Sequence, residues 1–189
     1  MTTIEIPILA DAGIPMIFVQ WPLMLCALIP VILIEALLIR RWVPLSYGDA
    51  FKGTGIANVV STVAGIPLTW VALLLIELAI LLPLSQFDPD PSLTVDFLIF
   101  PLGAAWLGPV RAYWIVSAAA TILLIPFFFA SVWIEYWCCC FIWKKMDRTI
   151  IWRGVFRANV ASYLLLFLMG CGWTFFNYWT RKTLYPFAP

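Results

Sequence analysis

The chain has 189 residues, of which 64% are hydrophobic and only 11% are charged, and its formal net charge is +1. Soluble domains are about 45–50% apolar and about 25% charged, and a soluble fold of this size could not bury so much apolar surface. The composition therefore excludes an ordinary soluble protein and indicates an integral membrane protein.

Four uncharged segments are long enough to cross a bilayer as helices, because a spanning helix needs about 20 mostly apolar residues. They are residues 14–34, 56–76, 112–134 and 158–180. They are too long for strands and lack the alternation that a β-barrel requires. Since backbone polar groups in lipid must be satisfied within the segment, all four are predicted to be helices. The predicted fold class is an all-α, polytopic membrane bundle that forms a single domain, residues 1–189.

The connector between the second and third predicted spans, residues 84–111, is expected on the outer side of the membrane. Residues 86–92 are turn-rich and polar, whereas residues 97–107 are apolar but too short to span. Two interpretations of the apolar part are equally favoured. It forms an interfacial or partly re-entrant segment, or it is a loop that covers the end of the bundle.

The basic residues predict the orientation, because cytoplasmic loops of membrane proteins are enriched in Lys and Arg. Eight of the eleven lie in residues 40–52 and 144–157, between the first two and the last two predicted spans. Both stretches are therefore expected in the cytoplasm and both termini on the non-cytoplasmic side. Trp42, Trp143 and Trp152 are expected at the inner membrane boundary. The candidate contacts with anionic lipid on the inner face are Arg40, Arg41, Lys144, Lys145, Arg148, Arg153 and Arg157.

A ten-residue pattern occurs twice, as KGTGIANVVS at residues 52–61 and as RGVFRANVAS at residues 153–162. Each copy follows a segment that contains Ile-Glu, at a nearly equal distance along the chain. This placement favours an internal duplication into two helical hairpins, repeat 1 at about residues 15–83 and repeat 2 at about residues 112–180.

Two glutamates are predicted to lie within the inner leaflet, where an ionisable side chain is costly and needs a partner. We expect Glu35 to approach Asn58 and Glu135 to approach Asn159, with a serine one turn deeper on each asparagine face. The pairs form either a duplicated proton or cation site or hydrogen bonds that lock each hairpin. The second interpretation is favoured, because polar pairs between helices are common in membranes. The candidate residues are Glu35, Asn58, Ser61, Glu135, Asn159 and Ser162.

No catalytic, cofactor-binding or metal-binding residue is predicted, and no cofactor is indicated. The chain has no histidine, which excludes His-ligated haem and Ser-His catalysis, and its five cysteines have no CxxC spacing. Consecutive Cys138–Cys140 would fan apart around a helix and could not close a tetrahedral zinc site.

The function favoured by the sequence is that of a non-catalytic accessory, assembly or scaffold subunit of a larger membrane complex. Its expected partners are membrane lipids and either other membrane subunits or further copies of the chain, but not nucleic acid. The alternative is a small oligomeric transporter or channel that uses Glu35 and Glu135. An enzyme that acts on lipid is least favoured, because the sequence shows no nucleophile or metal cluster.

Overall fold

The computed structural model describes residues 14–15, 17–87, 106–107 and 113–184. Within these ranges it contains four helices: α2 (Ile17–Trp42), α3 (Tyr47–Phe87), α5 (Tyr113–Ile142) and α6 (Arg148–Leu184). Two short strands, β1 (Ile14–Pro15) and β2 (Trp106–Leu107), pair antiparallel, with Ile14 opposite Leu107. Apart from this two-residue pairing, the described chain is helical, as the composition predicts.

Three of the helices are long and apolar enough to cross a membrane, over Tyr47–Ile76, Ala120–Ile142 and Arg148–Thr180. The chain is therefore built for integration into a membrane. Helix α2 is 26 residues long but carries Glu35, Arg40 and Arg41 towards its end. Its described part is not among the segments that are long and apolar enough to cross a membrane.

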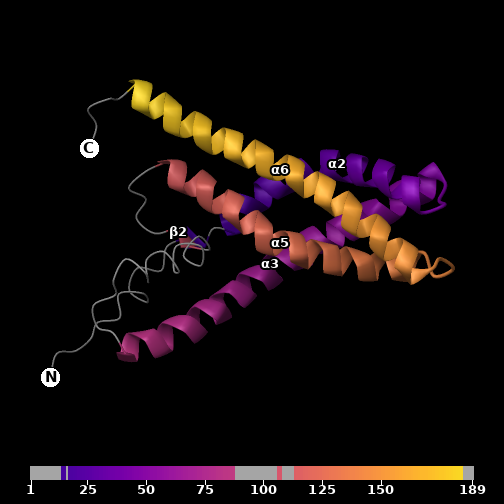
Figure 1. The fold of residues 1–189 in the computed structure, drawn as a ribbon, viewed down its shortest axis with the longest axis horizontal. Coiled ribbons are helices and arrows are strands. Elements are labelled where there is room, and N and C mark those ends of the chain that lie inside the picture. The colour runs from indigo at the N-terminus through magenta and orange to yellow at the C-terminus, as the bar shows by residue number, and fades with distance from the viewer. Residues whose placement is uncertain (1–13, 16, 88–105, 108–112, 185–189) are drawn as a thin grey trace.

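The four helices pack as a ring, in which α2 contacts α3, α3 contacts α5, α5 contacts α6, and α6 contacts α2. The α2–α3 and α5–α6 connections lie at the same end of this ring, whereas α3 and α6 diverge towards the opposite end (Figure 1). Below, this end of the bundle is called the connection end.

The helices extend further at the connection end than the apolar runs predict. The predicted basic loops, residues 40–52 and 144–157, are mostly helical, and only residues 43–46 and 143–147 join the helices. That prediction was wrong because an apolar run marks the lipid-crossing part of a helix and not its polar first turn.

Capping stabilises the first turns of α3 and α6: the Asp49 N–H donates to Ser46 Oγ (3.1 Å), and the Thr149 N–H donates to Asp147 Oδ1 (2.6 Å).

The apolar core near the connection end brings both halves of the chain together. Trp143 directly follows α5 and is only 7% exposed, so its ring packs inside the bundle. A Cβ at Gly53 would run into the Trp143 ring, and a Cβ at Gly154 would lie 2.9 Å from Val43 Cγ2. Gly53 thus lets α3 approach Trp143, which directly follows α5. Gly154 likewise lets α6 approach Val43, which directly follows α2. The buried members of this core are Ile39, Val43, Ala57, Cys139, Trp143, Ile151, Val155 and Ala158.

The predictions for the connector, residues 84–111, fall outside the described residues, except for residues 84–87 at the end of α3 and for strand β2. The predictions for both ends of the chain also fall outside them.

Candidate functional site: a pair of buried carboxyl groups

Two carboxyl groups lie in the core of the bundle, one on α2 and one on α5. Glu35 is 0% exposed and Glu135 is 2% exposed. Asn58 Nδ2 of α3 donates a hydrogen bond of 2.7 Å to Glu35 Oε2, and Asn159 Nδ2 of α6 donates one of 2.8 Å to Glu135 Oε2. The structure therefore brings together both pairs that the sequence predicts.

The two serines complete the hydrogen bonds of the carboxyl groups in a crossed manner. Ser61 Oγ of α3 lies 2.9 Å from Glu135 Oε1, and Ser162 Oγ of α6 lies 2.5 Å from Glu35 Oε1. Each serine thus contacts the glutamate of the other half of the chain, so that every carboxyl oxygen has a partner. The sequence places the serines on the correct helical face but does not show which glutamate each one contacts.

The same local bonds hold the polar side chains in both halves. Each asparagine Nδ2 also donates a hydrogen bond of 3.1 Å to the carbonyl oxygen four residues earlier. Asn58 donates to Thr54, and Asn159 donates to Val155. Each serine Oγ also lies 3.1 Å from the carbonyl oxygen of the asparagine three residues earlier. A serine hydroxyl has one proton to donate, so it cannot fully satisfy both this carbonyl and a carboxylate. A protonated carboxyl group that donates to the serine would resolve the shortage of protons.

The two carboxyl groups lie close together, because Asn58 and Ser61, three residues apart on α3, contact one carboxyl group each. The structure gives neither of them a Lys or Arg partner among the residues it describes. Because two neighbouring carboxylates in an apolar interior cannot both remain charged, at least one of the pair carries a proton.

Two very small cavities adjoin this cluster, with volumes of about 20 Å³ and about 10 Å³. Ser61, Thr62, Ser131 and Tyr163 line both of them. Tyr163 Oη donates a hydrogen bond of 2.9 Å to Ser131 Oγ across this region. A cavity of this size holds about one water molecule.

The two asparagines differ in the burial of an unpaired side-chain oxygen. Asn159 Oδ1 is buried without a hydrogen-bond partner in the described part of the chain, as are Thr54 Oγ1 and Trp143 Nε1. A buried acceptor without a partner costs about 1–3 kcal/mol, so Asn159 Oδ1 is the atom of the cluster most able to gain from one more donor.

Burial repeats between the two ten-residue patterns and the residues around them. The buried positions of α3 from Ala50 to Thr62 all have buried counterparts in α6, at the same places relative to the second pattern. The α3 positions are Ala50, Gly53, Thr54, Ala57, Asn58, Ser61 and Thr62, and the α6 positions are Ile151, Gly154, Val155, Ala158, Asn159, Ser162 and Tyr163.

The predicted lipid-contacting basic residues lie away from the carboxyl pair, exposed at the connection end. Two of the arginines stack on aromatic rings: the Arg40 guanidinium carbon is 3.2 Å from the centroid of Tyr47, and that of Arg157 is 5.3 Å from the centroid of Trp42. Neither contact is signalled by sequence spacing, because each joins two helices.

Comparisons with protein-family models, with curated proteins and with solved structures give no match. The function must therefore be inferred from the geometry of the site.

Proposed function

We propose that the chain is a non-catalytic integral membrane protein that serves as an accessory, assembly or scaffold subunit of a larger membrane complex. The observation that supports this proposal is the closed polar core. All carboxyl oxygens of Glu35 and Glu135 have partners, and the adjoining cavities hold about one water molecule. Such a core fixes helices against one another without offering a route to a solute.

In this proposal the carboxyl pair is a clamp between two duplicated hairpins, α2–α3 and α5–α6, related by a pseudo-two-fold axis along the membrane normal. Its support is the matched burial, the matched local hydrogen bonds and the crossed contacts of Gly53 and Gly154. Hydrogen bonds between membrane helices contribute about 0.6 kcal/mol each on average. The four bonds to the carboxyl groups would then contribute about 2–3 kcal/mol, enough to select one packing of the hairpins.

The proposal includes α2 as a fourth spanning helix, with the connection end in the cytoplasm and both termini on the other side. The exposed arginines and lysines at the connection end support this orientation through the positive-inside rule.

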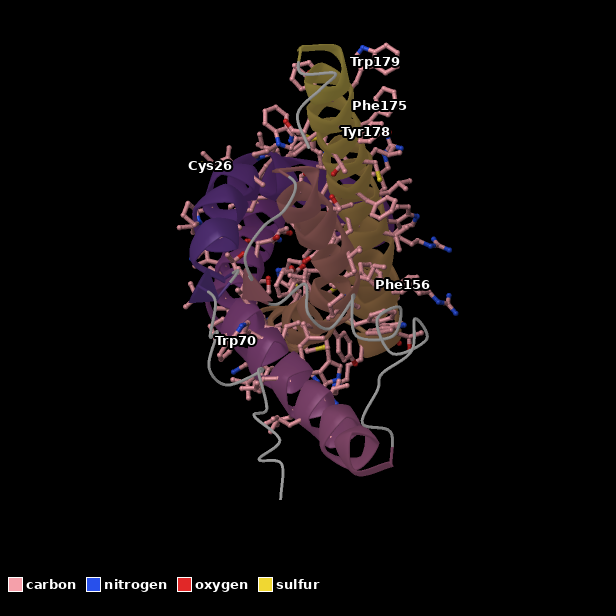
Figure 2. All side chains as sticks on the ribbon, turned by 90° about the vertical axis from the view of Figure 1, so that its left-hand side faces the viewer. Cys26, Trp70, Phe156, Phe175, Tyr178 and Trp179 are labelled. Atoms are coloured by element: carbon pink, nitrogen blue, oxygen red, sulfur yellow. The ribbon has the colours of Figure 1, made fainter. Side chains whose placement is uncertain are left out.

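The surface for partner subunits is proposed on the half of α6 that diverges from the bundle. Phe175, Tyr178 and Trp179 project outwards there (Figure 2), and Phe175 stacks on Trp179 with ring centroids 6.1 Å apart. Rigid aromatic side chains provide large contact areas at a small entropic cost, which suits a packing surface for neighbouring helices.

Purification of the full chain from its native membrane in mild detergent tests the proposal. We expect co-migration with defined membrane proteins at fixed stoichiometry, and loss of that co-migration in Phe175→Ala/Trp179→Ala. Phe141→Ala is a matched control, because Phe141 is an equally exposed aromatic residue on α5 at the connection end. A chain that migrates only with copies of itself would overturn the proposal.

The second candidate is a small oligomeric transporter or channel in which the carboxyl pair carries protons. Two observations favour it: among the described residues, the paired carboxyl groups have no basic partner, and Asn159 Oδ1 beside them has no donor. Reconstitution into liposomes with an imposed proton gradient tests it. Flux that is abolished by Glu35→Gln or Glu135→Gln, while both variants remain stably folded, would favour transport over the clamp.

A further inference from the structure

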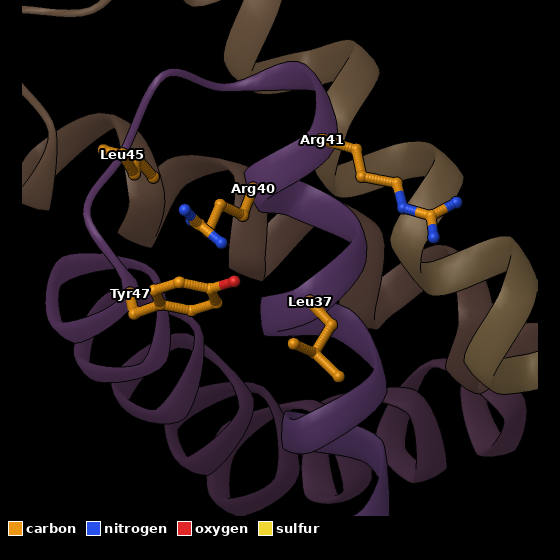
Figure 3. Close-up of a pocket in the computed structure, with 5 residues that line it drawn as sticks. All are labelled: Leu37, Arg40, Arg41, Leu45 and Tyr47. Atoms are coloured by element: carbon orange, nitrogen blue, oxygen red, sulfur yellow. The ribbon is translucent and has the colours of Figure 1, made fainter.

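An open pocket of about 520 Å³ lies where α2 turns into α3, at the connection end (Figure 3). It is lined by Leu37, Arg40, Arg41, Leu45 and Tyr47. Arg40 extends towards Tyr47, whereas Arg41 extends in the opposite direction, so the two cations flank Leu37. The pocket therefore combines two positive charges with an apolar floor.

The Arg40 side chain is held in place, yet its hydrogen-bonding capacity remains available. Its guanidinium carbon lies 3.2 Å from the centroid of the Tyr47 ring, a stacked arrangement that leaves the N–H groups at the edge free to donate. The two acids nearest in sequence have other partners: Glu35 is hydrogen-bonded to Asn58 and Ser162, and Asp49 accepts a hydrogen bond of 2.7 Å from Ser46 Oγ. The structure shows no ion pair for Arg40 or Arg41 among the described residues, so both charges are available to an anion.

The last helical turn of α2 carries both arginines, whereas the last helical turn of α5 has no basic residue, so this helix ending does not require them. Both first helices end in the same way, with the Val43 N–H 2.8 Å from the Ile39 carbonyl oxygen and the Trp143 N–H 2.8 Å from that of Cys139. Relative to these end points, Cys140 and Phe141 stand where α2 has Arg40 and Arg41. The arginine pair is thus a feature added to one turn of a shared geometry.

We propose that this pocket binds the phosphate group of an anionic phospholipid, with Arg40 as its direct ligand and Arg41 as a second positive charge at the edge of the pocket. A guanidinium fork matches a phosphate group, and basic residues at a membrane boundary attract anionic headgroups. Ile29, Leu33 and Leu37 are spaced by four residues along α2 and are all about half exposed or more, at 68%, 48% and 51%. This apolar strip leads from the pocket along the spanning direction and provides a path for an acyl chain, which a free phosphate ion would not use.

The test measures the melting temperature of the full chain in detergent with added phosphatidylglycerol, phosphatidylcholine or inorganic phosphate. A ligand that binds only the folded state raises the melting temperature. We expect a rise of several degrees with phosphatidylglycerol and little change with the other two additives. Arg40→Gln/Arg41→Gln should lose most of that rise, whereas Lys144→Gln/Arg153→Gln, which removes the same amount of charge near the α5–α6 connection, should keep it.

Two results would overturn the proposal. An equal rise in both double variants would show that the lipid acts through net charge alone, and an equal rise with inorganic phosphate would show a site for soluble phosphate. Native mass spectrometry provides a second measurement if the Arg40→Gln/Arg41→Gln protein has a low melting temperature without lipid. The wild type and Lys144→Gln/Arg153→Gln should each retain a bound phosphatidylglycerol that Arg40→Gln/Arg41→Gln does not.

Discussion

Ser61 Oγ on α3 lies 2.9 Å from Glu135 Oε1 on α5, so a residue of the first half of the chain completes the hydrogen bonds of a carboxyl group in the second. Ser162 has the reciprocal relation to Glu35. The asparagine contacts join helices that are consecutive in the chain, whereas the serine contacts join the two halves. The polar core therefore links all four helices in one cluster.

Replacement of Ser61 by alanine should lower the free energy of unfolding by about 0.6–1.7 kcal/mol, the range measured for hydrogen bonds between membrane helices. The crossed contact is tested by double-mutant cycles in a detergent unfolding titration. Ser61→Ala should show a larger coupling energy with Glu135→Leu than with Glu35→Leu, and Ser162→Ala should show the reverse, because leucine removes the hydrogen bond to the serine. Equal couplings for both glutamates would contradict the crossed arrangement.

Glu35→Gln should fold with nearly unchanged stability. The amide oxygen of glutamine still accepts from Asn58 Nδ2, and its NH₂ group donates to Ser162 Oγ. Glu35→Leu should lower the free energy of unfolding by about 1–3 kcal/mol, because it leaves the buried Asn58 without its partner. Thermal unfolding in detergent compares the two variants. Stability that is unchanged in Glu35→Leu would refute a structural role for the pair.

The Glu–Asn pairs could be predicted from the sequence because both members lie near the same membrane boundary on consecutive helices. The crossed serine contacts could not, since they depend on how one hairpin rotates against the other, and no local pattern encodes that rotation. The burial of Trp143 shows the same limit. Its position after an apolar run does not show whether the ring faces lipid or the core, and the glycine at position 53 of another helix creates the space that buries it. The basic pocket was predicted only as a set of charges, because the stacking of Arg40 on Tyr47 depends on the tight turn between α2 and α3.

Gly53→Ala should lower the free energy of unfolding by about 1–3 kcal/mol, as expected for overpacking, because its Cβ would collide with the buried Trp143 ring. Gly154→Ala should also be destabilising, since its Cβ would lie 2.9 Å from Val43 Cγ2. Gly172→Ala is the matched control: it is helical and has nothing within 4 Å of its added Cβ. It should be neutral or stabilising by up to about 1 kcal/mol through helix propensity. Three equal melting temperatures would show that the two glycines are not packing positions.

Asp147 should make the start of α6 sensitive to acid. The Thr149 N–H that donates to Asp147 lowers the pKa of this carboxyl group below its usual value. A carboxyl group with a lowered pKa in the folded state adds stability that is complete above its unfolded-state pKa, about 3.9, and is lost as the pH falls through the lower folded-state pKa. Asp147→Ala should therefore be less stable than the wild type at neutral pH, and the difference should shrink in acid. Asp147→Asn retains a capping oxygen and should remove this pH dependence with little loss of stability. Melting temperatures across the acid range provide the measurement, and a constant difference between wild type and Asp147→Ala at every pH would contradict it.

The proposed orientation predicts which side of the membrane each exposed position faces. Pro44→Cys and Lys145→Cys place a thiol in each turn of the connection end, at exposed residues without a capping role. Lys182→Cys places one at the opposite end of α6, beyond the last residue of the candidate span. With the five native cysteines replaced, a membrane-impermeant maleimide applied to sealed cells should label Lys182→Cys and leave the other two unlabelled. Inverted vesicles should give the reverse pattern. Because the two turns are expected on one side, labelling of Pro44→Cys and Lys145→Cys from opposite sides would refute the parallel hairpins. Labelling of both from outside would show that the orientation is the reverse of the one proposed.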